Sequence, residues 1–79
     1  MSTKGGSLVK EFEVLAKNLK TLRKDFGYTQ ADVANVLGIT YQSYQAYELG
    51  ITVPSLKHFI RLAEFYDVSL DYLVGKKEI

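Results

Sequence analysis

Closely spaced signals for helix starts and stops constrain the fold of this chain of 79 residues more than any other feature. Serine or threonine stands before each of four apolar segments, where its side-chain oxygen can cap the first turn of a helix. These residues are Thr29, Thr40, Ser55 and Ser69. Because no segment alternates between apolar and polar residues as a half-buried strand does, the sequence predicts an all-α chain.

The longest periodic segment comes first, from residue 8 to residue 26. Its apolar residues recur every three or four positions, which places them in one stripe along an α-helix. They are Leu8, Phe12, Leu15, Leu19, Leu22 and Phe26. Ser7 is expected to cap this helix, and Gly27 is expected to end it in a left-handed conformation.

Four shorter helices are expected to follow. The second lies between the Thr29 cap and Gly38, and the third runs from Tyr41 to about Leu49 and ends at Gly50. The fourth follows Ser55 and reaches Tyr66, and the fifth follows Ser69 and closes at Gly75. Tyr44 and Tyr47 fall on the inward face of the third helix, which favours core packing over contact with a ligand. The fold class is therefore a compact five-helix domain over residues 8–75, with flexible tails at 1–7 and 76–79.

Several classes of function are excluded by composition. The chain has no cysteine, which removes disulfides, thiol nucleophiles and cysteine-ligated zinc and makes a cytoplasmic location the default. No apolar run approaches the ~18 residues of a membrane span. The single histidine, His58, has no cysteine or carboxylate pair nearby and is expected to be a surface residue. Without a nucleophile–base set or a glycine-rich phosphate loop, we expect no enzyme, no cofactor, no metal and no small-molecule substrate.

The central pair of helices carries the strongest indication of function. Thr29-Gln30-Ala31-Asp32 favours a capping box, and the segment Leu37-Gly38-Ile39 joins the two helices by a sharp turn that glycine permits. Ala34 is small enough for the helices to cross closely. The second helix of such a pair projects from the domain and has dimensions that fit the major groove of DNA.

Seven short motifs in register strengthen this interpretation. They are LKTLR (19–23), GYTQ (27–30), VA (33–34), LGI (37–39), YELG (47–50), PSL (54–56) and VSLDYL (68–73). With this spacing, residues 18–75 resemble the phage-repressor and Cro-type (Xre-like) family of helix-turn-helix regulators. The first helix, with Glu11-Phe12 and Ala16-Lys17, also resembles the POU-specific domain.

The resemblance implies a role for particular residues on double-stranded DNA. Gln30 would hold a phosphate, and Thr40 and Ser43 would belong to the start of the recognition helix over residues 40–48. The positions that match base-reading residues of the family are Tyr41, Gln42, Gln45 and Ala46. Arg23 and Glu48 match an ion pair that ties the first helix to the recognition helix. The implied function is that of a sequence-specific transcriptional regulator, with repression expected, acting as a homodimer.

The loop after the recognition helix departs from the family. Family members often carry asparagine and a lysine or arginine there to bind phosphate, whereas this chain has Leu49, Ile51, Thr52 and Val53. Lysine and arginine are absent from Tyr28 to Leu56, and the net charge is only +1. We therefore expect a shallow salt dependence of DNA binding. The alternative function is a protein-interaction module, such as an antitoxin-like or adaptor domain.

A second patch is open to two interpretations. The C-terminal part of the chain is richer in aromatic and apolar residues than one small core needs. These residues are Phe65, Tyr66, Tyr72, Val74 and Ile79. Part of them belongs to the core, and the rest could form a two-fold dimer contact.

Overall fold

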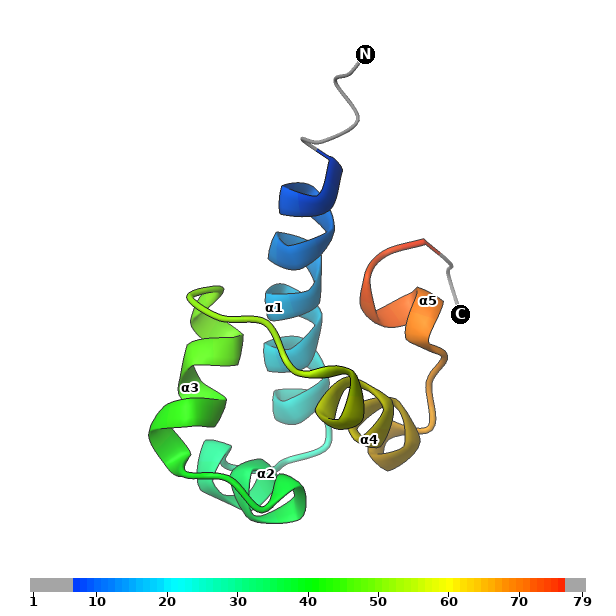
Figure 1. Cartoon of the computed structure of the whole chain (residues 1–79). Coiled ribbons are helices and arrows are strands. Elements are labelled where there is room, and N and C mark those ends of the chain that lie inside the picture. Colours follow the sequence, from blue (N-terminus) through cyan, green and yellow to red (C-terminus); the bar gives the residue numbers. More distant parts are fainter. Residues whose placement is uncertain (1–6, 77–79) are drawn as a thin grey trace.

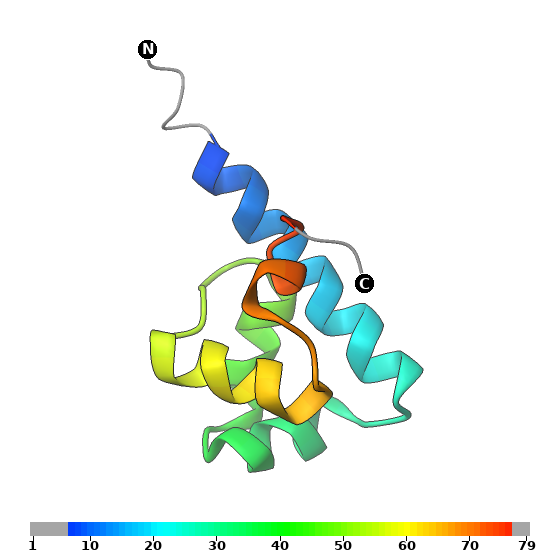
Figure 2. The ribbon, with the colours of Figure 1, turned by 90° about the vertical axis from the view of Figure 1, so that its right-hand side faces the viewer.

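The computed structural model describes residues 7–76, and within that range it consists of five α-helices and their connecting loops (Figure 1). The helices are α1 (Ser7–Asp25), α2 (Gln30–Leu37), α3 (Tyr41–Leu49), α4 (Leu56–Tyr66) and α5 (Leu70–Leu73). α3 and α5 both contact α1, and α2 packs against α3 and α4. In Figure 2 α4 and α5 lie on the side of the molecule that faces the viewer, and α5 contacts both α1 and α4.

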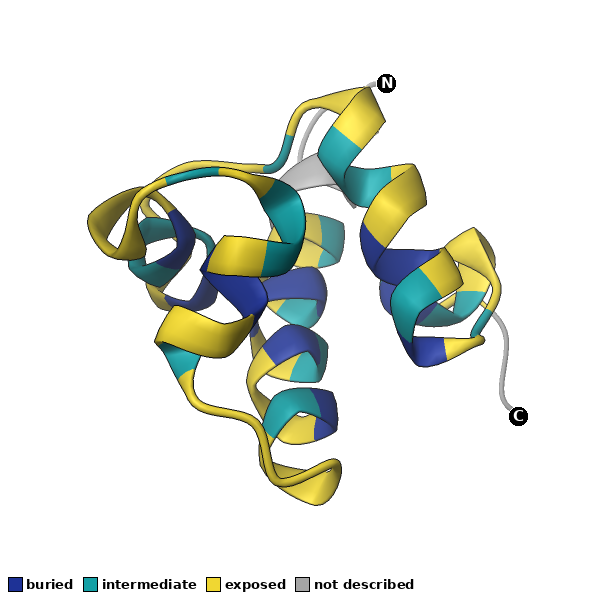
Figure 3. Cartoon of the chain, turned by 90° about the horizontal axis from the view of Figure 1, so that it is seen from below, coloured by how far each residue is buried: buried dark blue, intermediate teal, exposed yellow. Residues whose placement is uncertain are grey.

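Every helix contributes to a single core. The five largest fully buried side chains come one from each helix; in chain order they are Leu19, Val33, Tyr44, Leu62 and Leu73. In Figure 3 the buried positions accordingly face the space enclosed by the helices. Because the short helices are marginal alone, this shared burial is what stabilises them.

The predicted N-caps of the four shorter helices are confirmed. The side-chain oxygen of each cap accepts a hydrogen bond from the backbone amide three residues later. At Thr29 the bond is reciprocal, because Asp32 Oδ2 accepts from the Thr29 amide at 2.9 Å, which completes a capping box. α4 ends at Tyr66, as expected, but its C-cap was not foreseen: Asp67 is a non-glycine residue with φ of 56°.

The boundaries of α1 differ slightly from the expectation. Ser7 is the first residue of the helix rather than the residue before it, and Phe26 lies beyond the end. Phe12 and Phe26 are exposed, although both belong to the expected apolar stripe. The early turns of α1 extend past the other helices (Figure 1), so the stripe there has less to pack against.

The C-terminal end of the domain also differs from the sequence interpretation. Lys76, assigned to a tail, forms an ion pair with Glu11 of α1, and residues 1–6 and 77–79 lie outside the described range. Of the residues for which core packing and a dimer contact were both left open, Tyr66 is buried, and Phe65, Tyr72 and Val74 are half-buried and pack against the core. Ile79 is outside the described residues.

Candidate nucleic-acid interface

The turn between α2 and α3 sets the angle at which α3 leaves the domain. Gly38 has φ of 71°, and the amide of Ile39 donates to the carbonyl of Ala34 at 3.0 Å. Val33 and Ala34 are buried beneath this turn, while Leu37 and Ile39 pack against the edge of the core. The two helices therefore form one rigid unit rather than two hinged segments.

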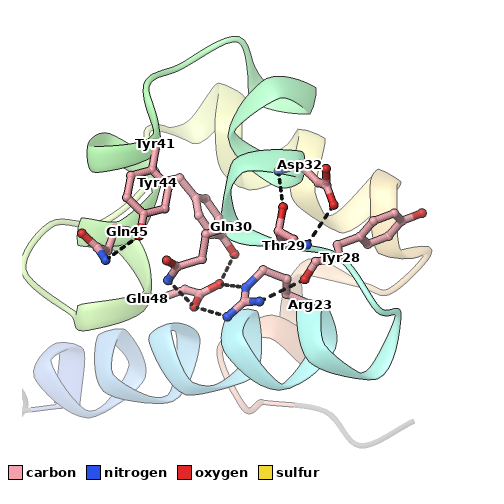
Figure 4. A network of polar contacts seen from close by, with 9 residues as sticks. All are labelled: Arg23, Tyr28, Thr29, Gln30, Asp32, Tyr41, Tyr44, Gln45 and Glu48. Atoms are coloured by element: carbon pink, nitrogen blue, oxygen red, sulfur yellow. Dashed lines mark hydrogen bonds and ion pairs between the residues drawn. The ribbon is translucent and has the colours of Figure 1, made fainter.

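Glu48, near the end of α3, is the centre of a buried polar network (Figure 4). Its Oε2 accepts from Arg23 Nε at 2.6 Å and from the Tyr44 hydroxyl at 2.5 Å. Its Oε1 accepts from Arg23 Nη2 and from Gln30 Nε2, both at 3.0 Å. The Arg23–Glu48 contact expected from the resemblance is thus a two-bond pair, and α1, α2 and α3 are all joined to one carboxylate.

The network shifts the acid–base properties of its members in consistent directions. Burial tends to raise the pKa of Glu48, but the hydrogen bonds from Arg23, Tyr44 and Gln30 outweigh burial and hold that pKa below its ordinary value of 4.5. Burial, followed by the hydrogen bond to Glu48, raises the pKa of the Tyr44 hydroxyl. The site therefore contains an ionised carboxylate, a cationic guanidinium and a neutral phenol at neutral pH.

The opposite side of α3 is open. Tyr41 is 44% exposed, Gln42 and Ser43 are exposed, and Gln45 and Ala46 are half-buried. Tyr44 and Glu48 point inward on the same helix, as the spacing predicted for Tyr44. The structure therefore brings the expected base-reading residues together on one accessible face.

Several of these side chains are held in place by hydrogen bonds within the helix. Thr40 Oγ1 accepts from the Ser43 amide at 3.1 Å and donates to Ser43 Oγ at 2.9 Å. Gln45 Nε2 donates to the Tyr41 hydroxyl at 3.1 Å (Figure 4), so these two residues act as a pair. For Gln42, the part of the chain that the structure describes supplies no side-chain hydrogen bond, which leaves its amide available to a partner.

Gln30, the expected phosphate contact, makes a structural contact that sequence reasoning missed. Its amide nitrogen donates one hydrogen to Glu48, and its side chain is only half-buried. An amide nitrogen carries two hydrogens, so one donor is left for a ligand. The bond to Glu48 fixes where that donor points relative to α3.

Two further polar contacts were also missed. Asn18 Nδ2 donates to the carbonyls of Tyr72 and Leu73, which ties α1 to the end of α5. A signal was present, because Asn18 lies between Leu15 and Leu22 on the apolar side of the first helix. The Tyr47 hydroxyl lies 2.9 Å from His58 Nδ1 and links α3 to α4. His58 is accordingly half-buried and packed against α3, rather than a purely solvated surface residue.

Comparison with known proteins assigns the chain to a family. Residues 19–73 match the family model described as Helix-turn-helix, which covers more than half of the chain. The chain belongs to the Xre-type helix-turn-helix family. This helix-turn-helix chain is 46% identical over 61 residues to the uncharacterized HTH-type transcriptional regulator YqaE of Bacillus subtilis, an alignment that covers 77% of this chain and 53% of YqaE.

Two further similar proteins are also named as a repressor or regulator of transcription. The cryptic phage CTXphi transcriptional repressor RstR of Vibrio cholerae is 32% identical over 62 residues, covering 78% of this chain and 55% of RstR. A crystal structure of a transcriptional regulator from Listeria innocua superposes with a TM-score of 0.76 at 32% identity, covering 82% of this helix-turn-helix chain and 61% of that one. The chain thus spans about half the length of the curated relatives named here. Of its helices within residues 7–76, none has the length and low polarity needed to cross a membrane.

Proposed function

We propose that this helix-turn-helix chain is a transcriptional regulator that recognises a specific DNA sequence by placing the N-terminal half of α3 in the major groove. The observation that carries the proposal is the division of α3 into two faces. Tyr41, Gln42 and Ser43 are exposed, whereas Tyr44 and Glu48 anchor the same helix to the core. A helix held this way can enter the groove, which admits one α-helix, without losing its packing.

The exposed side chains have chemistry suited to base edges. The Gln42 amide can donate to adenine N7 through its nitrogen and accept from adenine N6 through its oxygen, a bidentate pattern that distinguishes adenine from the other bases. The Tyr41 ring and the Ala46 methyl group offer apolar contact to a thymine methyl group. A good bidentate pair contributes about 1–3 kcal/mol of discrimination against a wrong base.

Phosphate contacts would come from neutral donors rather than from lysine or arginine on the motif. The remaining hydrogen of the Gln30 amide, the hydroxyls of Thr40 and Ser43, and the N-termini of α2 and α3 are the available groups. Arg23 does not serve here, because only 11% of its side chain is exposed and its guanidinium already donates to Glu48 and to the Tyr28 carbonyl. These contacts fix the register of the domain on the duplex and leave the base contacts to choose the sequence.

The proposed regulatory action is repression by a homodimer that occludes a promoter in the cytoplasm. Two copies on a palindromic site would place their α3 helices about 34 Å apart, one turn of B-DNA. A relative named as a phage repressor supports repression. The alternative of a protein-interaction module is not favoured, because the curated relatives described above are named as transcriptional regulators.

Selection of binding sites from random-sequence DNA at a fixed salt concentration tests the proposal. The wild-type chain should enrich a short motif, and Gln42→Ala should remove the preference at one position of it. Thr21→Ala is the matched control, because Thr21 is an exposed neutral residue of α1 outside the α2–α3 motif. Selection without any enriched sequence, or a motif that Gln42→Ala leaves unchanged, would reject sequence-specific reading by α3.

A further inference from the structure

A shallow hollow separates α3 from the loop that follows it, and it has no assigned role. The lining residues are Gln42, Ser43, Ala46 and Tyr47 of α3 and Thr52, Val53 and Ser55 of the segment that follows. Gln42, Ser43 and Ala46 also belong to the open face of α3 described above. The hollow is continuous with that face, and any ligand that lies along α3 meets the loop as well.

The loop is fixed against α3 by backbone contacts. Gly50 has φ of 74° and reverses the chain, and the amides of Ile51 and Thr52 both donate to the Ala46 carbonyl, at 3.0 and 3.4 Å. Val53 precedes Pro54, which restricts the backbone of Val53 to extended conformations. As a β-branched residue Val53 also has few accessible rotamers. Its methyl groups are therefore held in place before any ligand arrives.

The chemistry of the hollow differs from that of a phosphate site. Val53 is 46% exposed and apolar, Ala46 contributes a methyl group, and no charged side chain lines the hollow. In the major groove the one apolar group that a base pair presents is the C5 methyl of thymine. Cytosine carries only hydrogen at the equivalent carbon. The apolar part of the hollow, formed by Ala46 and Val53 beside a glutamine that can bind a base, is thus suited to distinguish thymine from cytosine.

We infer that Val53, together with Ala46, receives the C5 methyl group of a thymine next to the base pair read by Gln42, so that the loop after α3 helps determine sequence specificity. The inference rests on the proposed function and extends it to a residue outside the recognition helix. It also gives a reason for an exposed apolar residue at position 53. With valine there, the hollow can remove the thymine methyl group from water, whereas the side chain of a lysine or arginine would fill the hollow.

Replacement of thymine by deoxyuridine in the selected site tests this inference, because deoxyuridine lacks only the C5 methyl group. Each thymine is replaced in turn, and the dissociation constant is measured for the wild type and Val53→Ala. For the wild type, one replacement per half-site should weaken binding about fourfold, which corresponds to about 0.8 kcal/mol for one buried methyl-sized group. For Val53→Ala, the same replacement should weaken binding less than twofold.

Ile51→Ala is the matched control, since Ile51 is a more exposed apolar residue of the same loop that does not line the hollow. It should keep the full fourfold sensitivity to deoxyuridine.

Equal effects of deoxyuridine on the wild type and Val53→Ala at every position would overturn the inference. A motif without thymine beside the position whose preference is lost in Gln42→Ala would overturn it as well. If Val53→Ala weakens binding to all sequences equally and converts a dimer to a monomer in sedimentation, the hollow holds a second copy instead. Absence of any motif would refute the proposed function itself, whereas a motif without this coupling refutes only the role of Val53.

Discussion

Glu48 is a buried charge that joins three helices behind the exposed face of α3. Its carboxylate is a hydrogen-bond acceptor for residues of α1, α2 and α3 at once. Arg23 supplies the balancing positive charge, with only 11% of its side chain exposed. A charge removed from water in this way is tolerated because every acceptor site is used, and removal of one partner leaves the other charge buried and unpaired.

Acid titration of stability tests the ionised state of Glu48. The folded pKa lies below 4.5, so the unfolded chain binds a proton at Glu48 first as the pH falls. The stabilisation from Glu48 is therefore complete above pH 4.5 and decreases as the pH falls below it. Glu48→Gln should lower the free energy of unfolding by about 3 kcal/mol at pH 7, since Arg23 then lacks a charged partner.

The difference in free energy of unfolding between the wild type and Glu48→Gln should become smaller as the pH falls from 4.5. Urea unfolding at each pH measures this difference. Glu13→Gln, at an exposed position of α1, is the control and should follow the wild type closely. A difference in free energy of unfolding that stays constant below pH 4.5 would mean that Glu48 is not held ionised by its neighbours.

At the scale of the helices, the turn at Gly38 decides how α3 is presented. The left-handed conformation there puts α3 across α2, and a Cβ built at this position meets no atom within 4 Å. Glycine is therefore required for its backbone conformation, not for space. Gly75 differs, because a Cβ there would lie 2.8 Å from Val14 Cγ1, so that α1 and the end of α5 approach too closely for a side chain.

Substitutions at Gly38 distinguish a requirement for backbone conformation from a requirement for space. Gly38→Ala should reduce the free energy of unfolding by about 1–2 kcal/mol, the cost of a left-handed conformation for a residue with a Cβ. Gly38→Asn should cost less, because asparagine adopts this conformation more readily. Thermal or urea unfolding of the wild type, Gly38→Ala and Gly38→Asn gives the order of their stabilities. If alanine and asparagine were equally destabilising, crowding rather than conformation would be the cause.

The helices were predictable because their signals are local. Thr29, Thr40, Ser55 and Ser69 each cap the residue that follows three positions later, and apolar spacing marks the buried faces. A cap without a local signal was missed: Asp67, just after the correctly expected end of α4, adopts a left-handed conformation without being glycine. The exposure of Phe12 depends on how far the rest of the domain extends along α1, which spacing alone does not record.

The candidate site was predictable to a similar depth. The exposed row on α3 follows from the spacing of Tyr44 against Tyr41 and Gln42, and the Arg23–Glu48 pair followed from the family resemblance. The bond between Gln30 and Glu48 was not foreseen, because it joins residues 18 positions apart through the packing of α2 on α3. Contacts of that kind depend on the crossing of two helices and have no signature in either segment.

For the whole molecule, the distribution of charge matters more than its sum. The net charge is +1, and lysine and arginine are absent from residues 28–56, which include the whole α2–α3 unit and the loop after it. At the end of α3 and in the loop after it, the large apolar side chains are exposed: Leu49 is 65% exposed and Ile51 71% exposed. The proposed binding to DNA would therefore draw on short-range contacts and on lysines of α1 and α4, with weak long-range steering.

The salt dependence of binding measures this directly. The logarithm of the binding constant should fall with the logarithm of salt concentration with a slope shallower than about −5, against about −10 for a strongly basic repressor. Ile51→Lys should steepen the slope by about 0.9 for each phosphate it reaches. Thr21→Lys, which adds the same charge on α1, should change the slope less. A wild-type slope near −10 would show that more phosphates are bound than the described surface offers.

The most direct test of the central claim is the affinity of the wild type and of Gln42→Ala for the selected site and all of its single-base variants. If α3 reads bases through Gln42, the variant should lose discrimination at one base pair per half-site, by about 1–3 kcal/mol, and keep the wild-type pattern at all other positions. A uniform loss of affinity across every sequence, with the pattern of preference intact, would contradict the account, because Gln42 would then contribute to binding without reading the sequence.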